Sequence, residues 1–462
     1  MIKKISYISF LLFFLSLVLF ILTLSITGIK TDKFNNLIVN KISKNNIQLD
    51  LKSIYFKLDP KKLSLFLETP FPNISYKNFK IPTKKVKVYV DFLPLLKADL
   101  KVKNIYLALN ELNYAQLNEL SKFIKPSNFK SFINNKIKEV KLNSDIEIFF
   151  DKNGEVEDYI IKGKVQTLKV DLFKDIKLSK INLSFFADKE DILIKNIFGN
   201  IDDIKINDGD IKLNLENGIK LNSNFNSNIN LNSKNNKKFN DLLEKLKLKL
   251  EIKELNGNFI TNIFVKFNET YKLLDYYYEV SGKVNKSKIE LFDSIKNDIV
   301  KSEIKDIYFL ETQVDLKATK DNLKIDTSGK YSFNNVDFLQ LKIDCNLKSD
   351  LLQLNANFDY KNNFDLKIIN YNKPKERIAN ISLEFEKNKN ISNIKKLNFK
   401  EKNNSININN LKFKDNNFVS LKTADVSTKN NNFSIQWDKK IMIRGSSFDA
   451  TNLPKLLNQQ GK

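Results

Sequence analysis

The residues that usually carry chemistry are scarce in this chain. Histidine is absent, and Cys345 is the only cysteine. These two facts exclude an intramolecular disulfide, a zinc site built from cysteine and histidine, and a serine or cysteine nucleophile activated by histidine. Cys345 stands in phase with the apolar positions of its segment, which predicts a buried small side chain.

Carboxylates are the remaining candidates for acid–base or metal chemistry. Asp202-Asp203 and the pair Asp208 and Asp210 stand close together, with Gly209 between the second pair. Their turn-forming neighbours predict solvated loop tips. The sequence contains no glycine-rich phosphate loop and no nucleophile elbow. We therefore expect no enzyme, no cofactor and no metal site.

The formal charge of +23 comes from 77 basic and 54 acidic residues. Only Arg377 and Arg444 are arginines, although arginine is favoured for reading bases and clamping phosphates. The lysines alternate with acidic and amide residues instead of forming one block. This pattern predicts a solvated surface with some attraction for anionic lipid headgroups, and no nucleic-acid partner.

One apolar run stands apart from the rest of the chain. It extends from Ile5 to Ile29 without a charged residue, with Lys3 and Lys4 before it and Lys30 after it. As a helix this run would be about 37 Å long, enough to cross a hydrocarbon core of about 30 Å. A cleavable signal peptide is the alternative, but its apolar region is usually shorter and ends in small residues. We predict an uncleaved anchor, with residues 1–4 in the cytoplasm and the rest across the membrane.

Beyond the anchor, apolar and polar residues alternate again and again. Such alternation is typical of antiparallel strands with one buried face and one solvated face. Strand breaks are predicted at Asn153-Gly154, Asp208-Gly209, Asn217-Gly218, Asn256-Gly257 and Asn362-Asn363, since these residues accept the positive φ of hairpin turns. The residues predicted to face inward are Val86, Val88, Val90, Leu100, Val102, Ile146, Ile148, Ile211, Leu213, Leu215, Leu221, Phe225, Ile229 and Leu231.

Helices are predicted in few places. The segment 113–140 carries two short amphipathic patterns separated by Pro126, and a further pattern lies near 239–248. A short helix is also predicted at 34–42. The expected organisation is a cytoplasmic tip (1–4), a transmembrane anchor (5–29), a membrane-proximal β module (30–112), a helical segment (113–140) and a repetitive antiparallel sheet (141–462).

A sheet with one continuous apolar face must cover that face. The predicted helices are too few to do so. A second sheet would give a β-sandwich, and closure in a lipid bilayer would give an outer-membrane barrel, which lacks a helical anchor. The remaining solution is a mainly β protein with an elongated, curved antiparallel sheet that forms a groove. Such an apolar groove would shield acyl chains.

Several segments resemble the AsmA-like superfamily, in particular its YhdP and TamB group. The resemblance rests on the pattern from Val86 to Lys97 with Pro94-Leu95-Leu96, the strand from Val102 to Leu109, and the phrase Ser446 to Leu457. A tryptophan frequent in the YhdP branch is replaced here by Phe or Ile. The phrase near the end of the chain is followed by further β-sheet in longer relatives, as expected if this chain is a shortened member.

The resemblance implies a function that composition alone does not give. It implies a single-pass protein of the inner membrane of a Gram-negative-type bacterium, with its bulk in the periplasm. It also implies passage of glycerophospholipid along the groove toward the outer membrane, with an outer-membrane or periplasmic protein as a partner. The alternative is an envelope scaffold or assembly factor built from closed β-sandwiches, in which the same apolar residues contact each other.

Overall fold

The computed structural model describes residues 2–32, 35–36, 39, 47–50, 53–62, 64–76, 79–91, 101–123, 126, 128–173, 176–245, 249–270, 272–437 and 440–452. The chain is mainly β, with 68% of its residues in strands and one antiparallel sheet of 24 strands. One apolar helix precedes the sheet, and the other helices are short. The predicted mainly-β fold class is confirmed. The helix predicted at 34–42 falls largely outside the described residues.

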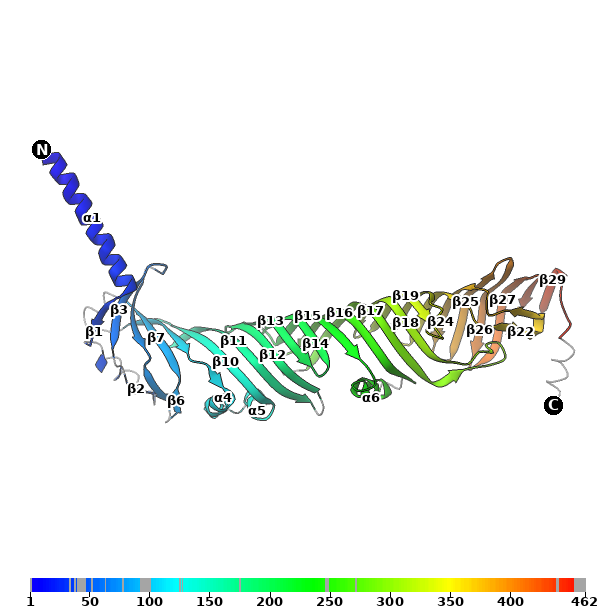
Figure 1. Cartoon of the computed structure of the whole chain (residues 1–462), viewed down its shortest axis with the longest axis horizontal. Helices are drawn as coiled ribbons and strands as arrows, with labels where there is room; N and C mark the ends of the chain where they lie inside the picture. The colour runs from blue at the N-terminus through cyan, green and yellow to red at the C-terminus, as the bar shows by residue number, and fades with distance from the viewer. Residues whose placement is uncertain are drawn as a thin grey trace. The chain divides into compact units, whose positions relative to one another are not determined.

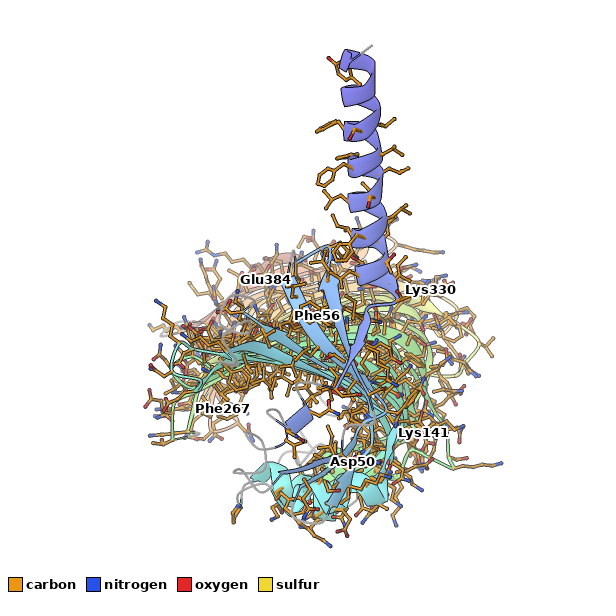
Figure 2. All side chains as sticks on the ribbon, turned by 90° about the vertical axis from the view of Figure 1, so that its left-hand side faces the viewer. Asp50, Phe56, Lys141, Phe267, Lys330 and Glu384 are labelled. Carbon is orange, nitrogen blue, oxygen red and sulfur yellow. The ribbon has the colours of Figure 1, made fainter. Side chains whose placement is uncertain are left out.

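Helix α1 (Ile2–Ile26) is the one described helix that is long and apolar enough to cross a membrane. Its side chains project on all sides of the helix (Figure 2), and most of them are exposed. The N–H groups of Thr27 and Gly28 both donate to the carbonyl of Thr23, and Gly28 has a φ of +73°. The helix therefore ends before Ile29, which begins strand β1 and pairs with Phe56.

The chain divides into two compact units, and the first comprises Met1–Asp202 and Asp208–Ile219. Its strands in the large sheet are β1 (Ile29–Thr31), β3 (Ile54–Asp59), β4 (Ser64–Pro70), β7 (Thr83–Val90), β8 (Val102–Leu109), β9 (Leu112–Asn113), β10 (Ile137–Phe150), β11 (Val156–Phe173), β12 (Ile176–Ala187), β13 (Asp191–Ile201) and most of β14 (Ile204–Asn214). Strands β2 (Ile47–Asp50), β5 (Asn73–Tyr76) and β6 (Phe79–Ile81) form a separate small sheet.

The second unit comprises Asp203–Asn207 and Lys220–Lys462. Its strands in the large sheet are β15 (Ile219–Leu231), β16 (Leu250–Phe267), β17 (Leu273–Ile295), β18 (Ile304–Thr319), β19 (Asn322–Ser332), β20 (Leu339–Lys348), β21 (Leu351–Tyr360), β24 (Ala379–Asn388), β25 (Ile391–Glu401), β26 (Asn404–Lys414), β27 (Asn417–Ser427), β28 (Asn432–Trp437) and β29 (Ile441–Ser447). From β16 to β29 these strands pair with their neighbours in chain order (Figure 1). Helix α6 (Lys237–Lys245) follows β15, and β22 (Phe364–Leu366), the 3-10 turn η1 (Lys367–Ile369) and β23 (Tyr371–Lys373) form a hairpin outside the large sheet.

The boundary between the units differs from the predicted domain organisation. The predicted boundaries at residues 112 and 140 lie inside the first unit. The strands before and after the helical segment pair directly with each other: Leu142 pairs with Leu112, and Asp145 pairs with Ala108. The segment is therefore an excursion from a continuous sheet.

The excursion holds the two short helices that the sequence predicts, α4 (Tyr114–Ser121) and α5 (Asn128–Asn135). Asn113 caps α4, because its side chain accepts from the backbone N–H of Gln116 while the Gln116 side chain accepts from the N–H of Asn113. Figure 1 shows both helices near β10. Ile133 of α5 belongs to one buried cluster with Val140 and Val170, so this part of the apolar face is covered by helices.

The predicted turns have a mixed outcome. Asn153-Gly154 and Asn217-Gly218 lie in turns with positive φ, and Asn362-Asn363 lies in the connection after β21. The prediction is wrong for Asp208-Gly209 and Asn256-Gly257, which lie inside β14 and β16. Glycine is needed at position 257 because the ring of Phe259 occupies the space that a side chain would need. The strand register also shifts at this point.

Candidate functional site

Strands β17 to β29 align one uninterrupted row of apolar side chains across the second unit. We call it the open row. It consists of Val280, Leu316, Ile325, Cys345, Leu354, Phe385, Ile394, Leu411, Leu421, Trp437 and Ile441, each paired with the next across neighbouring strands. At a strand spacing of about 4.8 Å, ten steps give a track of about 48 Å. None of these eleven residues is buried, and Ile441 is 52% exposed.

A second row runs beside the open row and is also mostly apolar. It consists of Phe259, Gly282, Val314, Thr327, Ile343, Ala356, Leu383, Leu397, Ile408, Ala424, Ile435 and Ile443. Gly282 is required where the ring of Phe259 lies against its backbone, since an added Cβ would stand 2.6 Å from that ring. Together the two rows form a wide apolar strip on one face of the sheet.

The opposite face of the second unit is polar and rich in ion pairs. Lys317 lies 2.9 Å from Glu279, and Glu290 is contacted by both Lys305 at 2.8 Å and Lys253 at 3.0 Å. Hydrogen bonds from these two lysines lower the pKa of Glu290 to about 2. These lysines and carboxylates therefore neutralise one another in cross-strand pairs.

The hairpin formed by residues 364–373 covers part of the apolar face, and we call it the covering hairpin. The ring of Phe364 stacks on Phe399 with centroids 5.2 Å apart, and Tyr371 meets Phe399 edge-on at 5.9 Å. Phe399 is only 4% exposed and belongs to one cluster with Ile369 and Val426. The row that contains Phe399 is thus a closed core, whereas the open row lies outside this cluster.

Buried polar groups fix the covering hairpin in place. Lys373 has no exposed surface, and the three N–H groups of its ammonium are shared among four backbone carbonyls, those of Lys361, Asn362, Pro374 and Arg377, at 2.6 to 3.1 Å. Burial lowers the pKa of Lys373 to about 8. Beside it, the buried carboxylate of Glu401 accepts from the Tyr371 hydroxyl at 3.1 Å and pairs with Arg377 at 3.3 Å.

The covering hairpin also contacts the connection between β17 and β18. The N–H of Asp365 donates to the carbonyl of Ile299 at 3.0 Å, and Val300 forms a β-bridge with Phe364. Both segments belong to the same rim of the sheet, since antiparallel strands place every second connection on one side. We call it the covered rim. The opposite rim carries the connections β16–β17, β18–β19, β20–β21, β24–β25, β26–β27 and β28–β29, most of them two residues long, and we call it the tight-turn rim.

The predicted inward residues of β7 and β8 share a face with Ile146 and Ile148 of β10, and those of β7 and β8 are packed. Val86 pairs with Leu107, which pairs with Ile146, and Val88 is linked through Ile105 to Ile148. Val88 and Val90 are only 7% and 4% exposed and form a cluster with Ile54 and Leu67, against which Val86 and Val102 pack. These residues therefore contact protein. Leu100 lies outside the described residues.

The predicted residues of β14 and β15 follow the expected alternation. Ile211, Leu213, Leu221, Phe225 and Ile229 are partly buried, whereas the intervening asparagines of β15 are exposed. Leu215 follows the end of β14 and is 38% exposed, and Leu231 is 1% exposed. Sequence reasoning did not select the open row, although the alternation around Cys345 was a usable signal. Cys345 lies on the apolar face but is only partly buried.

The carboxylates considered for chemistry have structural neighbours. Asp202 accepts from the N–H of Lys177 at 3.2 Å, and Asp210 accepts from the N–H of Asn196 at 3.2 Å. Asp208 and Asp210 lie on the exposed side of β14 and not at a loop tip. Within the described ranges, no group of three histidine, cysteine or acidic residues is arranged to hold a metal ion.

What the site offers is an extended apolar surface. Comparison of the chain with protein-family models, with curated proteins and with solved structures finds no match. The function must therefore be inferred from the apolar face and from α1.

Proposed function

We propose that this protein is anchored by α1 in a membrane and binds the acyl chains of glycerophospholipids on the apolar face of its sheet. The single observation that carries the proposal is the open row, in which eleven apolar residues on consecutive strands of the sheet keep exposed surface. Apolar surface exposed to water on this scale is unfavourable and usually marks a binding surface. Acyl chains lying along the row would remove that surface from water.

The arrangement also favours lipid over a second protein layer. A closed sandwich would cover the apolar face with another sheet. In the described part of the second unit, the additional sheet has two strands, β22 and β23, and it packs on the row of Phe399. A scaffold made of closed sandwiches therefore accounts for the covered row but not for the open row.

Direction and location belong to the same proposal. The helix α1 is long and apolar enough to span a membrane, and the lysines before it favour a cytoplasmic N-terminus. With the resemblance to the AsmA-like superfamily, we propose an inner-membrane protein whose sheet lies in the periplasm. The sheet would conduct phospholipid toward the outer membrane, with an outer-membrane or periplasmic protein receiving it.

The test is photo-crosslinking in cells with a matched pair at each site. The crosslinking residue is placed inward at Leu213, Phe225 or Leu354. The controls are the outward neighbours Lys212, Asn224 and Asn355, which are exposed on the polar face. Val88 is unsuitable because it lies in a packed cluster.

The expected result is phospholipid attached at the three inward sites and absent from the three controls. Crosslinks from the inward sites only to other parts of the protein would contradict the proposal. That outcome would mean that the face is a protein core, and it would favour the scaffold.

A further inference from the structure

The two rims of the second unit differ in how accessible they leave the apolar face. The covered rim carries the covering hairpin and the β17–β18 connection, which contact each other through Asp365 and Ile299. The tight-turn rim is formed mostly by two-residue turns, too short to fold back over the sheet. Apolar side chains near it are exposed, for example Leu347 at 38%, Phe418 at 39% and Ile391 at 51%.

Lysines accompany every connection of the tight-turn rim. One exposed lysine lies in or directly beside each of the six connections: Lys272, Lys320, Lys348, Lys389, Lys414 and Lys440. A further exposed lysine, Lys387, lies two residues beyond Phe385 of the open row and pairs with Leu352 on one side and Ser392 on the other. Among the described residues of these connections, exposed acidic residues are fewer: Glu269, Asp321, Asp350 and Asp415.

Most of these lysines differ from the ion-paired lysines of the polar face, although other polar-face lysines, such as Lys283 and Lys342, likewise have no ion pair among the described residues. Lys317, Lys305 and Lys253 each lie within 3.0 Å of a carboxylate. Among the described residues of the tight-turn rim, the lysine with an ion pair is Lys389, and its distance to Asp350 is 4.0 Å with both side chains well exposed. The positive charge of this rim is therefore largely available to an external anion.

We propose that the phosphate headgroups of bound phospholipids lie along the tight-turn rim and are paired by its lysines. This inference rests on the proposed function and adds an orientation to it. When an acyl chain lies on the open row, its headgroup must reach water at one rim of the sheet. The covering hairpin occupies the covered rim, so the tight-turn rim is the accessible one. A row of mostly unpaired ammonium groups beside the open row complements a row of phosphates.

The test uses the full chain reconstituted in phosphatidylcholine vesicles. Trp437 is the only tryptophan and belongs to the open row, so its fluorescence is quenched when a brominated acyl chain contacts it. Two probes with the same brominated chains are compared: phosphatidylglycerol, which is anionic, and diacylglycerol, which has no phosphate. The rim variant replaces Lys387, Lys389, Lys414 and Lys440, which lie on the connections and strands nearest to Trp437, by glutamine.

A control variant with the same change in charge replaces Lys283, Lys342, Lys396 and Lys412 by glutamine. These four lysines are exposed on strands of the polar face. If each lipid contacts one or two rim lysines, the rim variant should bind phosphatidylglycerol roughly three- to tenfold more weakly. Its binding of diacylglycerol should equal that of the wild type. Added salt should weaken the binding of phosphatidylglycerol by the wild-type and control proteins but not by the rim variant.

Each other outcome overturns a defined part of the inference. Equal losses in the rim and control variants would mean that general charge, and not the rim, attracts the lipid, while the proposed function would stand. An equal loss for phosphatidylglycerol and diacylglycerol would show that the rim lysines act on the fold. Absence of quenching by both probes in the wild type would refute the proposed function itself.

Discussion

Phe399 and Phe385 allow a direct test of whether the open row is a binding surface or a core. Both are phenylalanines in neighbouring strands of the same sheet. Phe399 is 4% exposed and contacts Phe364 and Tyr371, whereas Phe385 is partly exposed between Leu354 and Ile394. We predict that Phe399→Ala costs about 3–5 kcal/mol, the usual range for a buried phenylalanine, and that Phe385→Ala costs about 1 kcal/mol.

The assay is unfolding of the full chain in urea, followed by the fluorescence of Trp437. With a urea dependence of about 3 kcal/mol per molar, the midpoint should fall by about 1–1.7 M for Phe399→Ala and by about 0.3 M for Phe385→Ala. A third variant, Phe385→Leu, keeps an apolar side chain and should match the wild type. Equal losses for the two alanine variants would refute the distinction between the covered and open rows.

Two further predictions concern charges. On the polar face Asp344 pairs directly with Asp326, so Asp344→Asn should stabilise the protein by about 0.2–1 kcal/mol, and a lower midpoint in urea would contradict this reasoning. Burial lowers the pKa of Lys373 to about 8, whereas an unfolded lysine titrates near 10.4, so the unfolded state binds more protons in between and stability should rise with pH from about 8 to 10. The expected gain is on the order of 2 kcal/mol. Urea midpoints across this range should show the rise in the wild type but not in Lys373→Met; parallel curves would mean that Lys373 is not its source.

Sequence periodicity predicts which face a residue takes, because that depends only on neighbours along the strand. The alternation in β15 is correct residue by residue, from Leu221 to Leu231. How deeply a residue is buried depends on what packs above it. Val88 and Phe225 have the same local pattern, yet Val88 lies in a closed cluster and Phe225 keeps exposed surface.

The covering hairpin could not be predicted for the same reason. Phe364 and Tyr371 cover Phe399, which lies about thirty residues further along the chain, and no local pattern encodes that contact. Asp208-Gly209 failed as a turn because its dipeptide signal is local, whereas pairing with neighbouring strands decided the conformation. The ends of strands such as β14 are therefore set by pairing with neighbouring strands and not by the local dipeptide.

The order of the strands has a consequence for how such a protein can change in length. From β16 to β29 each strand pairs with the next strand of the large sheet along the chain. If a single strand were lost, every later strand would run in the opposite direction and every later connection would move to the opposite rim. The connections of the covered rim would then lie on the side that carries the lysines. Loss or duplication of a hairpin keeps every later residue on its face and its rim. The apolar track can therefore be shortened or extended in increments of two strands, about 10 Å each, without redesigning the remainder.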